Sequence, residues 1–181
     1  QLPLFPFHEY IQAMKPRVCV IGTGPSGITA IKNLLDEGLA VKAYDYNHDV
    51  GGNWIYTENE SHSSVFETTH IISSKTMSQY EDFTFDDFEA GIPDYPSHDQ
   101  IRRYFQAYAA HFGLYAHIEF KTLVKHCERI NDHKWNVTTE CNGIQKTETF
   151  SHLVVCNGHH WQPRYPEYPG EFTGTLLHSH H

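Results

Sequence analysis

Residues 17–27, RVCVIGTGPSG, decide the fold of this chain. Four apolar residues at 18–21 form a continuous run, which is typical of a strand buried on both faces. The run leads directly into the G-x-G-x-x-G of residues 22–27, and an apolar helical face follows it. The three glycines would allow a tight turn, close approach of the backbone to a pyrophosphate, and close packing of the helix on the strand. Pro25 suits the first helical turn, because its missing N–H needs no partner there.

An acidic residue lies where a dinucleotide-binding fold needs one. The predicted helix ends at Gly38, and a second strand at 41–44 leads to Asp45, 18 residues beyond Gly27. A carboxylate at this position hydrogen-bonds the ribose hydroxyls of a bound dinucleotide. Residues 45–49 contain no Lys or Arg, so they would accommodate a 2′-phosphate poorly. We therefore expect an unphosphorylated adenosine ribose, as in FAD or NAD, rather than NADP.

The middle of the chain predicts one long helix. Ser97 is a good N-cap for a helix over residues 98–112, and Gly113 is a suitable residue for its end. Aromatic residues recur there at intervals of three and four, which indicates one face packed in the core. The segments 61–77 and 81–95 show no regular period and are interpreted as a winding segment and a loop.

Strands dominate the last third of the chain. Asn142-Gly143 is a strong hairpin signal, and the strands of the predicted antiparallel meander lie at 118–120, 124–130, 135–141 and 144–150. The apolar run 153–156 then returns to the buried parallel sheet. It ends in residues 157–159, at the edge where open α/β sheets bind ligands. The predicted fold is therefore α/β: a Rossmann-like parallel sheet with helices on both faces and an inserted antiparallel β-meander.

Composition excludes several classes of function. The 181 residues suffice for one domain with a substantial core, and a net charge of −9 argues against nucleic acid as a partner. No apolar run approaches the roughly 20 residues needed to span a bilayer. The four cysteines share no metal-type spacing and are interpreted as reduced, hydrophobic thiols, and no metal site is predicted. We expect a cytoplasmic protein.

Five motifs together resemble the flavin-containing monooxygenase family. The first is the glycine-rich sequence with Asp45, and the others are Gly51-Gly52-Asn53-Trp54, His62-Ser63-Ser64-Val65-Phe66, Val155-Cys156-Asn157-Gly158-His159 and Phe172-x-Gly174-x-x-x-His178-Ser179. The resemblance extends over nearly the whole chain. It implies an enzyme in which NADPH reduces FAD, O2 adds to the flavin, and a C4a-hydroperoxyflavin transfers oxygen to a soft nitrogen or sulfur nucleophile.

The resemblance also implies which residues bind FAD. Gly22, Gly24, Pro25, Ser26 and Gly27 would line the pyrophosphate, and Asp45 would bind the ribose. Gly52, Asn53 and Trp54 would lie near the ribityl chain and the flavin, with His62 and Ser64 also at the cofactor. The backbone of Val124 would meet the adenine, and Cys156, Asn157 and Gly158 would close over the cofactor.

Two departures from the family pattern bear on these expectations. Ile72 aligns with an asparagine whose amide faces the flavin oxygen adduct in the family, so either Ser73 or Ser74 serves instead or the adduct is stabilised differently. No catalytic residue is therefore named. The chain also contains no second G-x-G-x-x-G. We thus expect residues 1–16 to be an N-terminal extension and 17–181 to be an FAD-binding domain that stops before the NADPH-binding domain.

Alternatives remain at the level of sequence. A related Baeyer–Villiger monooxygenase would insert oxygen into ketones, although His178-Ser179 favours the group that oxygenates nitrogen and sulfur. A domain that binds FAD without catalysis is a third reading, which reduction of the bound flavin by NADPH would exclude. The expected partners are a small nucleophilic substrate, O2 and the missing NADPH-binding domain, with association into a homo-oligomer left open.

Overall fold

The computed structural model describes residues 16–58, 65–159 and 163–178. Its centre is a four-stranded parallel sheet in the order β3-β2-β1-β7. The strands are β1 (Arg17–Ile21), β2 (Ala40–Tyr44), β3 (Ile118–Glu119) and β7 (His152–Val155). The apolar run at the start of the glycine-rich sequence forms β1, which lies between two neighbours and is buried at its three middle residues. The predicted α/β class is thus confirmed.

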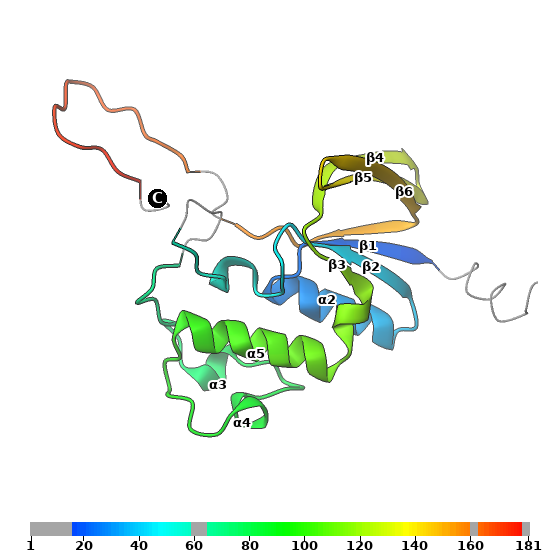
Figure 1. Ribbon diagram of the computed structural model, residues 1–181, viewed down its shortest axis with the longest axis horizontal. Helices are drawn as coiled ribbons and strands as arrows, with labels where there is room; N and C mark the ends of the chain where they lie inside the picture. The colour runs from blue at the N-terminus through cyan, green and yellow to red at the C-terminus, as the bar shows by residue number, and fades with distance from the viewer. Residues whose placement is uncertain (1–15, 59–64, 160–162, 179–181) are drawn as a thin grey trace, which may run out of the picture.

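Helices cover one face of this sheet (Figure 1). Helix α2 (Pro25–Asp36) begins at the glycine-rich loop, and α5 (His98–His111) packs beside it. The core on this side joins aliphatic residues of α2 and the sheet to aromatic residues of α5 and the preceding loop. Burial of these apolar side chains is the main favourable contribution to folding. The helical face predicted from aromatic periodicity is therefore a core face.

Helix α5 forms where its local sequence signals predict it. The Ser97 hydroxyl accepts from the Gln100 N–H, and the Gln100 side chain accepts from the Ser97 N–H in return, which completes a capping box. At the other end Gly113 has φ of 67°, a left-handed conformation that glycine adopts without penalty. The helix is followed by a 3₁₀ turn, η2 (Leu114–His117), which leads into β3.

The opposite face of the parallel sheet is covered by a three-stranded antiparallel sheet (Figure 1). Its strands are β4 (Leu123–Asn131), β5 (Lys134–Cys141) and β6 (Ile144–Phe150). Asn142 and Gly143 join the last two strands with φ of 51° and 77°, as a type I′ hairpin turn requires. The predicted meander is confirmed, while helices cover one face of the parallel sheet rather than both.

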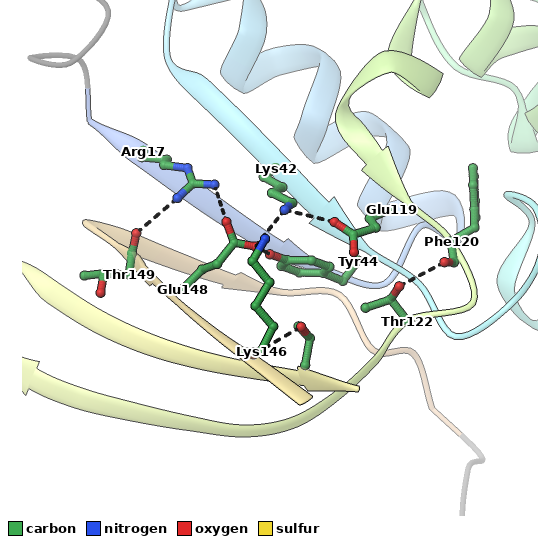
Figure 2. Close-up of polar contacts among 10 residues, drawn as sticks. Arg17, Lys42, Tyr44, Glu119, Phe120, Thr122, Lys146, Glu148 and Thr149 are labelled. Carbon is green, nitrogen blue, oxygen red and sulfur yellow. Dashed lines mark hydrogen bonds and ion pairs between the residues drawn. The ribbon is translucent and has the colours of Figure 1, made fainter. Parts of the chain in front are cut away.

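One carboxylate joins the two sheets (Figure 2). Glu148 of β6 accepts from Arg17 at 2.9 Å, from Lys42 at 2.7 Å, from the Tyr44 hydroxyl at 2.5 Å and from Lys146 at 3.2 Å. Its side chain is only 14% exposed. Burial by itself would raise the pKa of Glu148, but the donors of Lys42, Tyr44 and Arg17 outweigh it and hold this pKa well below the usual range.

Beneath this ion cluster the two sheets bury a second, smaller apolar core. It consists of Cys19, Tyr44, Val137 and Phe150. The Cys19 thiol has no exposed surface, and burial raises its pKa to about 12. All four cysteines are free thiols, as predicted, with Cys19 fully buried and the other three half-buried.

Three segments differ in detail from the sequence prediction. Residues 118–120 were assigned to the meander, but Ile118–Glu119 form β3 and pair in parallel with β2. The interpreted loop at 81–95 contains a short helix, α4 (Phe85–Phe88), which Thr84 and Asp87 cap reciprocally. The winding segment ends in another short helix, α3 (Lys75–Ser78). Each of these elements is four residues or fewer, too short for a periodic pattern to reveal.

Candidate cofactor-binding site

A cavity of about 650 Å³ opens at the carboxyl ends of β1, β2 and β7. Open α/β sheets bind ligands at this edge, and the volume lies within the range of cofactor sites. The predicted site residues that line it are Gly22, Gly24, Pro25, Ser26, Asp45, Gly52, Asn53, Trp54, Val124, Cys156, Asn157 and Gly158. The structure thus brings together residues from five separate parts of the sequence.

Two glycine loops form the floor of the cavity by close backbone approach. A Cβ atom on Gly24 would lie 3.3 Å from the Gly52 Cα, and one on Gly52 would lie 2.9 Å from the Gly24 Cα. The Gly51 N–H also donates to the Thr23 carbonyl at 3.3 Å. Gly52 is the first residue of the 3₁₀ turn η1 (Gly52–Trp54), and Trp54 of this turn lines the cavity. Side chains at either glycine would separate the loops or fill the space between them.

The amino terminus of α2 faces this floor. Gly24 is its N-cap, no side chain caps it, and its first turn carries no acidic residue. The unsatisfied N–H groups and the helix dipole therefore favour a negatively charged ligand such as a pyrophosphate. Among the described residues that line the cavity, Asp45 is the one charged group, so binding of an anion there would depend on backbone donors rather than on cations.

Gly27 does not line the cavity, although it was predicted at the pyrophosphate. A Cβ there would lie 2.0 Å from the Gly22 carbonyl oxygen and 3.7 Å from the Cys156 Cβ. Its role is to let α2 pack directly against the turn after β1.

Asp45 is buried and held by three donors. Its Oδ2 accepts from the Thr23 N–H at 2.6 Å and from the Thr23 hydroxyl at 2.7 Å, and its Oδ1 accepts from the Asn47 N–H at 2.8 Å. The backbone of Asp45 is also anchored, because its carbonyl accepts from the Thr122 N–H at 2.9 Å. A carboxylate with this many contacts is already oriented before any ligand arrives.

A second network, at the edge of the core, orients the loop that carries Gly51 and Gly52. Asp49 accepts from the Gln106 amide of α5 at 2.6 Å and from the Tyr115 hydroxyl at 2.9 Å. Burial, reinforced by Asp49, raises the pKa of Tyr115, so this phenol stays protonated as a donor. Helix α5 therefore positions the Gly51-Gly52 loop although it lies outside the cavity.

The turn after β7 meets the same loop from the other side. The Asn53 side-chain amide donates to the His159 carbonyl at 3.3 Å, which joins the two walls of the cavity. Burial raises the pKa of the Cys156 thiol, so it lines the site as a neutral group.

Sequence reasoning missed several lining residues, among them Tyr46, Asn47 and Thr122. It also missed Thr23, which contacts Asp45 without lining the cavity. Thr23 lies at the variable position of G-x-G, and only its approach to Asp45, 22 residues away, reveals a role. Thr122 lacks any local signal, because the pairing of β2 with β3 brings it to the site.

Other expected positions fall elsewhere. His62 and Ser64 lie outside the described residues. Ile72 is 99% exposed and does not line the cavity. The hydroxyls of Ser73 and Ser74 hydrogen-bond those of Ser78 and Thr76, around α3. Neither serine is among the lining residues.

Two other kinds of site are absent from the described part of the chain. Within residues 16–58, 65–159 and 163–178 no group of three or more His, Cys, Asp or Glu is arranged to hold a metal ion. None of the described helices is long and apolar enough to cross a membrane.

Known proteins are similar to this chain in sequence and in fold. A family model described as flavin-binding monooxygenase-like matches residues 15–181. Flavin-containing monooxygenase 5 of Rattus norvegicus is 37% identical over 175 residues, which cover 91% of this chain and 32% of that protein. Flavin-containing monooxygenase 3 of Homo sapiens is 34% identical over 177 residues, covering 92% and 32%. The chain thus spans about a third of these relatives' length.

Solved structures show the same fold. Tmm from Pelagibacter sp. strain HTCC7211 superposes with a TM-score of 0.81 at 25% identity, over 91% of this chain and 41% of that one. Cyclohexanone monooxygenase in its open form superposes with a TM-score of 0.67 at 24% identity, over 86% and 29%. With the match of the family model over residues 15–181, these findings show that the chain belongs to the flavin-binding monooxygenase-like family.

Proposed function

We propose that this chain binds FAD in the cavity and forms the FAD-binding portion of an NADPH- and O2-dependent monooxygenase that oxygenates soft nitrogen or sulfur nucleophiles. The observation that carries the proposal is the convergence of the Gly24 and Gly52 loops, the uncapped start of α2 and Asp45 on one cavity. The dinucleotide pyrophosphate would lie on the two loops, and its adenosine ribose would lie at Asp45. FAD, once reduced, supplies the oxygen-transfer chemistry that no side chain provides.

The proposed reaction type and domain organisation rest on the similarity to the relatives. The two relatives described above, at 37% and 34% identity, are named flavin-containing monooxygenases, which favours nitrogen and sulfur oxygenation over the Baeyer–Villiger alternative. The likeness to cyclohexanone monooxygenase, at 24% identity, concerns the fold alone. Under this proposal residues 17–181 form the FAD-binding domain, and NADPH binds a domain present in the longer relatives. A cytoplasmic location and a homo-oligomeric state stay predictions.

The first test is flavin binding by the purified chain. We expect FAD to bind with a perturbed visible spectrum and quenched flavin fluorescence, and expect Gly24→Val to abolish both because its side chain would fill the space between the loops. Gly24→Ala is the graded control, since its Cβ alone lies 3.3 Å from the Gly52 Cα. Full flavin occupancy in Gly24→Val would refute the site. If NADPH never reduces flavin bound to a longer form of the protein, the chain only binds FAD.

Asp45→Ala is expected to weaken FAD binding by about 1–3 kcal/mol, because it removes a charged acceptor for the ribose hydroxyls. Titration followed by flavin fluorescence measures this loss. Asp132→Ala, at an exposed turn of the meander, removes the same charge at a distance and should leave affinity unchanged. Equal affinity in the wild type and Asp45→Ala would place the ribose elsewhere.

A further inference from the structure

We infer that Thr23 determines how the ribose is recognised: by holding Asp45 from the protein side, it leaves the carboxylate able to accept one ribose hydroxyl instead of two. The inference rests on the proposed FAD site. It concerns selectivity between the 2′ and 3′ hydroxyls, which the presence of an acid at this position does not by itself decide.

The geometry places both Thr23 donors on one oxygen. The N–H and the hydroxyl of Thr23 reach Asp45 Oδ2 at 2.6 and 2.7 Å, while the Asn47 N–H reaches Oδ1 at 2.8 Å. An ionised carboxylate offers about four acceptor positions, two on each oxygen. Among the described residues these three donors take both positions on Oδ2 and one on Oδ1. One acceptor position on Oδ1 is left for a ligand.

Burial shows from which side Thr23 acts. Thr23 has no exposed surface and is not a cavity-lining residue, whereas Asp45 is 6% exposed and lines the cavity. The Thr23 hydroxyl therefore lies behind the carboxylate, out of reach of a ligand. A hydroxyl has one proton to donate, and here it points to Asp45. The contact is thus between two parts of the protein, and binding of a nucleotide would not displace it.

Two hydroxyls of one ribose would then compete for one acceptor position. The hydroxyl that bonds Oδ1 gains a charge-assisted hydrogen bond, and its neighbour gains none from Asp45. Removing the first hydroxyl from the ligand should reduce affinity about tenfold or more, while removing the second should change it by less than about threefold.

The test compares FAD with two analogues that carry 2′-deoxyadenosine or 3′-deoxyadenosine. The wild-type chain should discriminate between the analogues by about tenfold or more. Thr23→Val keeps the shape of the side chain but removes its hydroxyl donor. The carboxylate of Asp45 is then free to turn Oδ2 toward the cavity and offer a second acceptor position to the ribose. In this variant both analogues should bind more weakly than FAD by similar factors. Thr23→Ser retains the hydroxyl and should retain the wild-type ratio.

Thr139→Val is the matched control, because Thr139 is also buried and its hydroxyl donates to the Lys146 carbonyl within the meander. It should leave the ratio unchanged. The inference is overturned if the wild type loses the same affinity with both analogues, or if Thr23→Val keeps the wild-type ratio. Failure of FAD itself to bind the wild type would instead refute the proposed function, and the inference with it.

Discussion

Gly27→Ala is expected to destabilise the fold by about 3 kcal/mol or more and to abolish FAD binding, although it adds a single methyl group. The added Cβ would lie 2.0 Å from the Gly22 carbonyl oxygen and 2.8 Å from the Gly22 carbonyl carbon. Both are backbone atoms, so no side chain can rotate away. Either α2 moves off the sheet or the turn after β1 opens, and each movement disrupts the cavity floor.

Urea unfolding followed by circular dichroism measures the loss of stability. Gly91→Ala is the control, because φ is +82° at Gly91 but an added Cβ would meet nothing within 4 Å. It should cost only about 1–2 kcal/mol, the penalty of a left-handed alanine. If the two variants lost equal stability, the close approach at Gly27 would not be the cause.

Glu148→Gln is expected to destabilise the chain by about 2 kcal/mol at pH 7. Removing one partner of a buried ion pair costs about 3–5 kcal/mol, because the opposite charge is left without compensation. The effect here is smaller, since the side chains of Arg17 and Lys146 are 42% and 61% exposed and stay partly hydrated. Glu119→Gln is the control: Glu119 is 44% exposed and, among the described residues, forms an ion pair with Lys42 alone, so its substitution should cost less than about 1 kcal/mol.

The pH dependence of the unfolding free energy distinguishes a loss of charge in Glu148→Gln from a packing defect. Because the pKa of Glu148 is lowered in the folded chain, its contribution to stability is complete above the unfolded pKa of about 4.3 and is lost as the pH falls towards the folded value. The difference in unfolding free energy between wild type and Glu148→Gln should therefore be constant from pH 6 to 8 and shrink in acid, as judged by urea titrations. A difference that persists unchanged at pH 3 would indicate a packing defect instead.

Elements with contiguous signals were predictable from the sequence. The strand, glycine turn and helix of residues 17–36 occupy one stretch, and each part has a local physical cause: apolar continuity, glycine conformation and an N-terminal proline. The hairpin at Asn142-Gly143 and the capping of α5 by Ser97 are likewise specified by a few adjacent residues. For the same reason most of the proposed lining residues were found, since they follow the ends of predicted strands.

Non-local contacts were not predictable in this way. Residues 118–120 were placed in the meander because a two-residue strand carries no period, and only its pairing with β2 assigns it to the parallel sheet. Glu148 lies in β6, whose sequence IQKTETF is mostly polar. Nothing in the adjacent residues distinguishes its side chain from those of its exposed neighbours. Its burial depends on Lys42 and Arg17, more than 100 residues earlier.

The sequence by itself therefore determined the chemistry of the site: a glycine-rich turn at a helix start, and an acid at the end of the second strand. The tertiary structure decided which residues hold the groups of the site in position. Thr23 faces Asp45, Asp49 joins the second glycine loop to α5, and Glu148 joins the two sheets. Local conformation follows from neighbouring residues, whereas a hydrogen bond across 22 or 100 residues exists only after the strands have paired and removed water from between them.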